Sequence, residues 1–342
     1  MEELKSAFHR VVVTMLISLL MCAIQYVLTY YSEHGSLPDW SSLTTSGENE
    51  YNSYESEIAA NVVRPESIAE RLDDIGGLRG VKEDIRAQVL IPLQHPRVFF
   101  GSVESLHPPR GILLHGPPGT GKTMLARAIA AEARCPFLAL SLSALENKWF
   151  GETSKLLGAT FSLARKMQPC VLFFDEIDGM IRTRGDQDQS AVYGLKTEFL
   201  SHMDGIKTTP HDAFIVVACT NCVASLDPAI KRRLPQQYKI DFPDGEDVLA
   251  ILRVHLKNSG LPFSAIETFA AVLRNGVTGS DIRELVKATW AVQRKKMMLS
   301  SRFVSKLKAG MVNAAAIEKS TGRMKLHNLV RVARQKDMLI RT

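Results

Sequence analysis

The sequence lacks several features that would place the chain in familiar protein classes. None of its nine histidines stands in an H-E-x-x-H pattern, which excludes a membrane-anchored zinc protease. Proline and glycine, 15 and 22 of 342 residues, are too few for a fibrous or low-complexity chain. An apolar fraction of 45% and a charged fraction of 23% exclude disorder as the main state. The chain is therefore expected to fold, and its length predicts two or three units rather than one.

Cysteines and glycosylation signals are also sparse. The five cysteines are an odd number without regular spacing, which indicates a reducing compartment and no disulfides. Cys219 and Cys222 form a C-x-x-C pair, but no second pair completes a zinc site. No N-x-[ST] sequon occurs, which agrees with a domain that never enters the secretory lumen.

The positive charge is local. The net charge is +6, but residues 302–342 carry ten Lys or Arg against two acids, so the remaining residues are slightly acidic. This distribution does not favour nucleic acid as a partner. A solvated basic helix face is the favoured interpretation of the tail, with an anionic membrane or an acidic partner as alternatives.

The only long uncharged segment lies near the N-terminus. Residues 11–32 contain no charged side chain, and as a helix they would span about 33 Å, enough to cross a bilayer. A cleaved signal peptide fits less well, because the apolar part is too long and no small-residue cleavage site follows. The sequence thus predicts a tail at 1–10, a transmembrane helix at 11–32, and an acidic, flexible linker at 33–63 with six acids and no Lys or Arg.

A phosphate-binding pattern stands in the middle of the chain. Residues 116–123 read G-x-x-x-x-G-K-[ST], between an apolar strand expected at 112–114 and an apolar helix expected at 124–133. The glycines let backbone N–H groups point at phosphate, Lys122 can reach the β and γ phosphates, and Thr123 can hold Mg²⁺. The segment therefore predicts a nucleotide site.

Two further strands deliver polar residues suited to phosphoryl transfer. The apolar run 171–174 ends in Asp175, which can bind the Mg²⁺ water shell, and Glu176, which can accept a proton from the attacking water. The run 213–218 leads to Asn221, whose amide could orient the water or the γ-phosphate. ATP and Mg²⁺ are thus the expected ligands.

Arg232 and Arg233 end a short predicted helix and have no obvious acid nearby in the sequence. Alone, such a pair is usually a surface feature. In a chain with the phosphate loop, it suggests arginine fingers that stabilise the transition state in a neighbouring subunit.

Taken together, these motifs resemble the AAA+ family, specifically its single-ring, meiotic-type clade, over about Asp73–Leu285. The matching segments also include Asp74–Leu78 and Gly279–Asp281. The resemblance implies a homo-hexameric ATP hydrolase. It implies nucleotide contacts from Asp74, Ile75, Gly76, Pro118, Gly119, Thr120, Gly121, Lys122, Thr123, Met124, His255, Gly279 and Ser280, with Thr123 and Asp175 toward the metal.

The segment Asn147–Glu152 resembles the first pore loop of that family. There, aromatic side chains from six subunits line a channel and grip an unfolded chain, because they offer large, sequence-tolerant contact area. Phe150 replaces the more usual Tyr. The resemblance assigns substrate contact to Lys148, Trp149, Phe150 and Gly151, and a second pore loop to 178–189.

The anchor, the short linker and the Lys-Trp-Phe-Gly loop together resemble the AAA+ extractases of the mitochondrial outer membrane, also found on peroxisomes, which remove mislocalised tail-anchored proteins. Residues 203–206 take the place of the family's Asp-Gly intersubunit signal. The implied partners are a lipid bilayer and tail-anchored proteins, with the ATPase domain facing the cytosol. Lys5 and Arg10 weakly favour the opposite orientation, but the ATP site requires this one.

The alternative function is a microtubule-severing ATPase of the spastin type. The acidic residues at 33–63 oppose it, because they would be repelled by tubulin tails. A non-enzymatic scaffold is disfavoured because Glu176 and Lys122, which hydrolysis needs, are intact. A DNA-directed AAA+ loader is disfavoured because of the predicted membrane span. The expected fold is an α/β P-loop domain with a doubly wound parallel sheet at 64–242, followed by a smaller helical domain at 243–342.

Overall fold

The computed structural model describes residues 51–99, 107–141, 153–180, 189–208, 212–300 and 324–340. The predicted transmembrane helix, the first pore loop and most of the second lie outside these ranges. Across the described ranges, no helix is both long enough and apolar enough to cross a bilayer.

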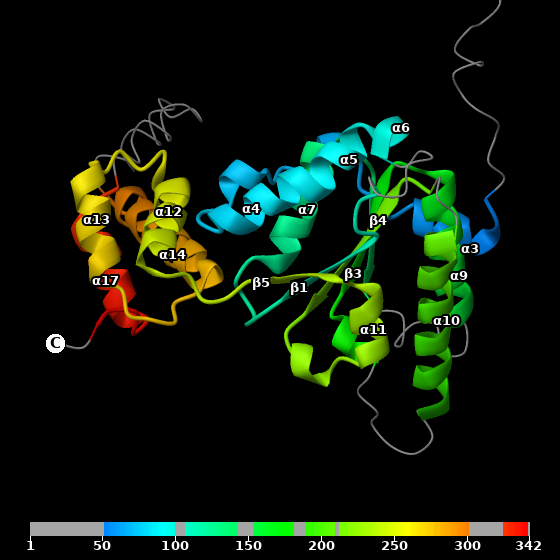
Figure 1. Ribbon diagram of the computed structural model, residues 1–342. Helices are drawn as coiled ribbons and strands as arrows, with labels where there is room; N and C mark the ends of the chain where they lie inside the picture. The colour runs from blue at the N-terminus through cyan, green and yellow to red at the C-terminus, as the bar shows by residue number, and fades with distance from the viewer. Residues whose placement is uncertain are drawn as a thin grey trace, which may run out of the picture. The chain divides into compact units, whose positions relative to one another are not determined.

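A parallel sheet organises the first part of the described chain (Figure 1). Its apolar runs are buried on both faces, as expected for parallel strands covered by helices, and the strands expected at 112–114, 171–174 and 213–218 are confirmed. The spatial order is β2-β3-β4-β1-β5, with all neighbours parallel. The strands are β1 (Gly111–His115), β2 (Phe137–Ser141), β3 (Cys170–Asp175), β4 (Phe214–Thr220) and β5 (Gln236–Lys239).

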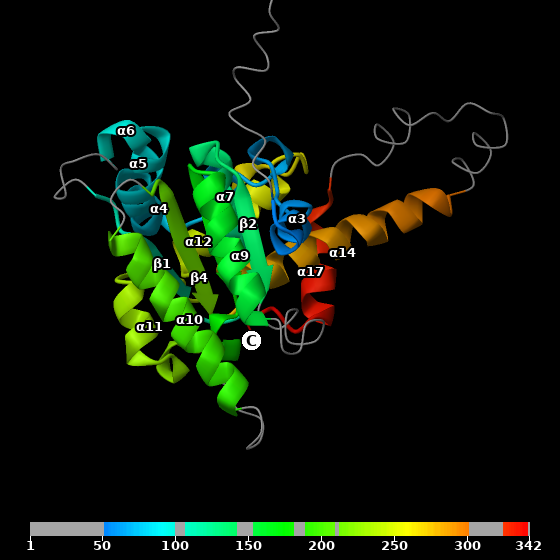
Figure 2. The same cartoon turned by 90° about the vertical axis from the view of Figure 1, so that its right-hand side faces the viewer.

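Helices cover both faces of this sheet, which confirms the doubly wound architecture (Figures 1 and 2). Successive strand residues point to opposite faces. On β4, Val217 packs with one helical layer and Val216 with the other. The first layer is α4 (Arg79–Ile85), the π-helical turn η3 (Arg86–Leu90), α5 (Ile91–Gln94), α6 (Pro96–Phe99) and α7 (Lys122–Ala133); the second is α3 (Ser53–Ala59), α9 (Thr153–Lys166), α10 (Gln189–Thr208) and α11 (Pro228–Arg233).

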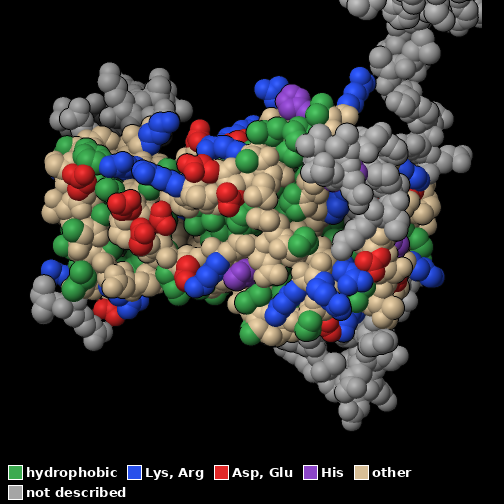
Figure 3. Space-filling model, viewed as in Figure 1, with side chains coloured by type: hydrophobic (Ala, Val, Ile, Leu, Met, Phe, Trp, Pro, Cys, Tyr) green, Lys and Arg blue, Asp and Glu red, His purple; other side chains and the backbone are tan. Residues whose placement is uncertain are grey.

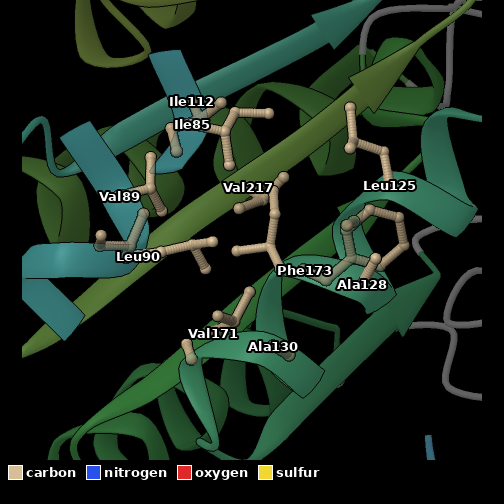
Figure 4. Close-up of a cluster of buried hydrophobic side chains, with 14 of the residues drawn as sticks. Ile85, Val89, Leu90, Ile112, Leu125, Ala128, Ala130, Val171, Phe173 and Val217 are labelled. Atoms are coloured by element: carbon tan, nitrogen blue, oxygen red, sulfur yellow. The ribbon is translucent and has the colours of Figure 1, made fainter. Parts of the chain in front are cut away.

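The core of the first layer is closely interdigitated (Figure 4). Leu125 and Ala128 from α7 meet Phe173 from β3, while Ile85 and Val217 close the cluster from α4 and β4. This packing fixes α7, and with it the loop that precedes α7, against the sheet. Short 3-10 turns complete this part of the chain: η1 (Pro65–Ser67), η2 (Leu72–Asp74), η5 (Ile177–Met180) and η6 (Val223–Ser225).

Helix α3 corrects the predicted extent of the flexible linker. Residues 51–63 were expected to belong to it, but Ser53–Ala59 is a helix that packs against α9. Asn52 and Glu55 form a capping box, and Ile58 joins the hydrophobic core. The folded domain therefore begins before residue 64, because the carboxylate of Glu55 is buried and paired with Lys166 of α9 rather than repelled by neighbouring acids.

The helices after β5 have a hydrophobic core of their own. Leu252, Phe269, Leu285 and Leu329 belong to it. A single bridge between Leu273 and Leu339 joins the chain after α13 to the chain after α17. The described helices of this region are α12 (Gly245–Leu256), α13 (Phe263–Ala271), α14 (Gly279–Met298) and α17 (Leu326–Gln335).

The described part of the basic tail includes α17. Arg331 and Arg334 are exposed, and Lys336 pairs with Glu284 of α14 at 3.1 Å between Nζ and Oε2. On the face seen in Figure 3, basic and acidic side chains both lie over the helical region. These features agree with a solvated helix face.

Candidate nucleotide-binding site

The turn between β1 and α7 has the backbone geometry of a phosphate-binding loop. Gly116 has φ +145°, and a Cβ at this position would collide with the carbonyl oxygen of Ile240. Only glycine is therefore compatible with this turn. Gly121 then precedes the first residue of α7, so that the helix N-terminus, with its unpaired N–H groups and positive potential, faces the loop.

Lys122 lies under this loop with 7% of its surface exposed. Its Nζ donates hydrogen bonds of 2.8 Å to the carbonyl oxygens of Gly116 and Pro117. Burial lowers the pKa of Lys122, while Cys219, Asp175 and Asp178 act in the opposite direction. The ammonium group is thus held at the loop by neutral carbonyls, which phosphate oxygens can replace with a stronger, charge-assisted interaction.

Asp175 and Glu176 meet the loop at the carboxyl end of β3. The Thr123 hydroxyl donates to Asp175 Oδ2 at 3.3 Å, so a hydroxyl and a carboxylate stand together as hard oxygen donors suited to Mg²⁺. Glu176 has φ +51°, an uncommon left-handed conformation for this residue type. Its N–H donates to Asp175 Oδ1 at 3.1 Å, and its carbonyl accepts from Gly179 N–H at 2.8 Å.

Asn221 follows β4, the neighbour of β3 in the sheet. Thr220 immediately before it is buried, and its hydroxyl donates to Asp178 Oδ1 at 2.8 Å. The same hydroxyl accepts from the N–H of Cys222 at 3.0 Å. The sequence predicts Asp178 only as the first residue of the second pore loop and predicts no role for Thr220. The one signal for the pair is that each polar residue lies at or shortly after the end of an apolar strand.

The helical region closes the other side of the site. A Cβ on Gly76 would collide with the backbone of Ile251 in α12, so only glycine permits this close approach. The N–H of Leu78 donates to Asp247 Oδ1 at 3.3 Å, and the N–H of Ser280 donates to the carbonyl of Gly119 at 3.0 Å. The phosphate loop and the segment before α4 are thus both held against helices from the end of the chain.

His255 of α12 is one of the lining residues from this side. Burial lowers its pKa, and the positive charges of Arg283 and Lys287 act in the same direction. A neutral imidazole can both donate and accept a hydrogen bond. It is therefore suited to an uncharged ligand group such as a base or a ribose.

These elements surround one cavity of about 430 Å³. All thirteen residues expected to contact nucleotide line it, together with Asp175, Glu176 and Asn221. Four further lining residues were not predicted. Arg127 and Glu70 are an ion pair at 3.3 Å, and the others are Ile251 and Arg283.

The two arginines of α11 lie elsewhere. Neither Arg232 nor Arg233 is among the described residues that line the cavity. Arg232 is exposed, whereas Arg233 donates to both oxygens of Asp204 in α10, at 2.9 and 2.6 Å. Arg233 has no acid close to it in the sequence, but the fold gives it an acidic partner, because α10 brings Asp204 to its side. Lys148, Trp149, Phe150 and Gly151 lie outside the described residues.

The sequence is similar to that of known ATPases and translocases. Residues 112–242 match a family model described as "ATPase family associated with various cellular activities (AAA)". The outer mitochondrial transmembrane helix translocase of Xenopus tropicalis is 41% identical over 234 residues, covering 68% of this chain and 65% of that protein. The human protein of the same name is 40% identical, with 68% and 64% covered. This chain therefore spans slightly less than two thirds of these relatives' length.

A relative of similar length also matches. The mitochondrial sorting homolog of Caenorhabditis elegans is 32% identical over 318 residues, covering 90% of this chain and 91% of that protein. Among solved structures, the FIGL-1 AAA domain in complex with ADP is 28% identical with a TM-score of 0.66, covering 84% of this chain and 92% of its own. A structure titled for katanin self-assembly is 25% identical with a TM-score of 0.62, covering 85% and 93%.

Proposed function

Because this chain belongs to the AAA family of ATPases, we propose that it couples ATP hydrolysis to the extraction of proteins from a membrane. The observation that carries the proposal is the single cavity in which the phosphate loop, both strand-end carboxylates and Asn221 stand together. The similarity to translocases of transmembrane helices supports the choice of substrate.

The hydrolytic roles follow from the contacts at the cavity. Lys122 and the N-terminus of α7 would neutralise charge on the β and γ phosphates. Thr123 and Asp175 would hold Mg²⁺, which when bound neutralises the developing charge of the transition state. Glu176 would accept the proton of the attacking water, and Asn221 would orient that water.

The mechanical step requires more than one subunit. We propose a homo-hexamer in which Arg232 and Arg233 reach the site of the adjacent subunit, as a charge supplied in trans. Lys148, Trp149, Phe150 and Gly151 would then grip the substrate in a central pore. Pulling a 20-residue apolar helix from lipid costs tens of kcal/mol at about 0.8 kcal/mol per buried CH₂, so several ATP molecules must be consumed per substrate.

We propose that the chain is located in the mitochondrial outer membrane, with the peroxisomal membrane as a second location. Residues 11–32 would anchor the chain as a single span, with the ATPase domain in the cytosol where ATP and mislocalised tail-anchored proteins are both present. The mitochondrial names of the relatives support this assignment.

The test is release of a fluorescent tail-anchored protein from liposomes that contain the full-length chain. We expect release that requires ATP and Mg²⁺ and disappears in Glu176→Gln, a variant that should still bind ATP. Steady ATP hydrolysis without release would refute the extraction function. Severing of microtubules under the same conditions would instead favour the spastin-type alternative.

A further inference from the structure

Two buried side chains connect the ends of β3 and β4 behind the nucleotide cavity. Thr220 is 1% exposed and Asp178 is 7% exposed. The Thr220 hydroxyl donates to Asp178 Oδ1 at 2.8 Å and accepts from the N–H of Cys222 at 3.0 Å. One hydroxyl thus joins the turn after β3 to the turn after β4.

Thr220 and Asp178, the two residues of this hydrogen bond, each lie within two residues of a proposed catalytic residue. Asn221 stands between Thr220 and Cys222, so the hydrogen bond from the Cys222 N–H closes a small turn around it. Glu176 stands two residues before Asp178 in the turn that continues into η5. Thr220 and Asp178 are not themselves among the described residues that line the cavity.

The conformation of Glu176 requires such support. Its left-handed φ of +51° is unfavourable for a residue with a side chain, and such conformations persist only where the surrounding structure holds them. Ile177, the next residue, is fully buried in the core, and Asp178 is anchored to β4. The turn that carries Glu176 is therefore held on its C-terminal side by buried Ile177, by the Asp178 hydrogen bond and by the bond from Gly179 N–H to the Glu176 carbonyl.

We propose that Asp178 and Thr220 are positioning residues that hold Glu176 and Asn221 in fixed register across β3 and β4. This inference rests on the proposed ATP hydrolysis at this site. Since misplacing a catalytic group by about 1 Å can cost about 100-fold in rate, losing the connection should lower kcat. Nucleotide affinity should change little, because the phosphate loop and the helical region provide the binding contacts.

The first test compares Thr220→Val with Thr220→Ser in the full-length chain. Valine keeps the shape and loses the hydroxyl, whereas serine keeps a hydroxyl that can both donate and accept. We expect Thr220→Val to lower kcat by about 10- to 100-fold with the Kd for fluorescent ADP within about twofold, and Thr220→Ser to recover most of the rate. Equal rates for the two variants would overturn the proposal.

Thr160→Val is the matched control, because Thr160 is equally buried but its hydroxyl bonds the Leu156 carbonyl within α9. It should leave kcat unchanged; a loss as large as that of Thr220→Val would indicate a general packing effect. Asp178→Ala provides a second route should Thr220→Val not fold. It should lower kcat to a similar extent, and a normal kcat would contradict the connection.

The double variant separates a shared role from two independent ones. If Thr220 and Asp178 act through one connection, Thr220→Val with Asp178→Ala should lose no more rate than the worse single variant. Wild-type hydrolysis is measured alongside Glu176→Gln. A wild-type chain that does not hydrolyse ATP refutes the proposed function, whereas active wild type with active Thr220→Val refutes only the positioning role.

Discussion

The buried carboxylate of Glu55 gives a quantitative prediction about how α3 is held to the ATPase domain. Glu55 is 1% exposed. Its oxygens accept from Lys166 Nζ at 2.6 Å, from Ser162 Oγ at 2.6 Å and from the N–H of Asn52 at 2.9 Å. Lys166→Met keeps most of the aliphatic stem and removes the charge, so it leaves the carboxylate buried with one partner fewer.

The expected cost is set by the loss of that partner. A hydrogen bond to a charged group contributes about 1.5–3 kcal/mol, and removing one member of a fully buried ion pair costs about 3–5 kcal/mol. Because 31% of the Lys166 side chain is exposed, water can reach the ammonium end of the pair. We therefore use the range for a hydrogen bond to a charged group rather than the range for a fully buried ion pair. We expect a loss of about 2 kcal/mol, or roughly 4–8 °C in Tm.

The pH dependence provides an independent check. Burial acts to raise the pKa of Glu55, but the hydrogen bonds from Lys166, Ser162 and Asn52 outweigh it and lower the pKa below its ordinary 4.5. A carboxyl with a depressed pKa contributes stability above its unfolded pKa and loses that stability as the pH falls through the folded pKa. The difference between wild type and Lys166→Met should therefore be full at pH 7 and shrink below pH 4.5.

The assay is thermal unfolding of the full-length chain in detergent, followed by circular dichroism at pH 7 and near pH 4. Lys257→Met, at an exposed lysine of the helical region, is the matched control and should change Tm little. The stabilising role of the Glu55–Lys166 pair is refuted if Lys166→Met is no less stable than this control. It is also refuted if the loss is the same at both pH values.

Three further predictions concern the nucleotide site and α11. Gly76→Ala should weaken binding of fluorescent ADP at least tenfold, because its Cβ would displace the backbone of Ile251; unchanged affinity would contradict the observed approach. Arg232→Ala should lower ATPase activity without changing nucleotide affinity or Tm. Arg233→Ala should also lower Tm, because it removes two hydrogen bonds to Asp204; melting and activity assays on both variants check this, and equal Tm values would contradict it. Chelation by EDTA should abolish hydrolysis and added Mg²⁺ should restore it; metal-independent hydrolysis would exclude the role given to Thr123 and Asp175.

The sheet and its phosphate loop could be predicted because their signals are local. Apolar runs buried on both faces predict parallel strands, and the loop motif fixes its own backbone through glycine. The strand-end positions of Asp175 and Asn221 then follow, since parallel strands end at one edge. These features depend on residues a few positions apart.

The structural features that the sequence did not predict depend on contacts between distant parts of the chain. Glu55 looked like part of an acidic linker because its partner Lys166 lies 111 residues away. The sequence shows no acid close to Arg233, because Asp204 lies on a different helix, 29 residues earlier. Thr220 and Asp178 are 42 residues apart and carry no motif that announces their hydrogen bond. Composition and spacing do not report such pairs, because tertiary packing creates them.

The composition of the cavity wall suggests how hydrolysis would lead to movement. Lys122 and Glu176 come from the sheet domain, whereas His255 and Ser280 come from the helical region, so a nucleotide would contact both. Among the described residues, the hydrogen bonds that join these walls include Ser280 N–H to the Gly119 carbonyl and Leu78 N–H to Asp247. A ligand shifts a conformational equilibrium by the difference in its affinity for the two states. Because the γ-phosphate would be held mainly from the sheet side, its loss would weaken one wall selectively and change the preferred angle between the two parts.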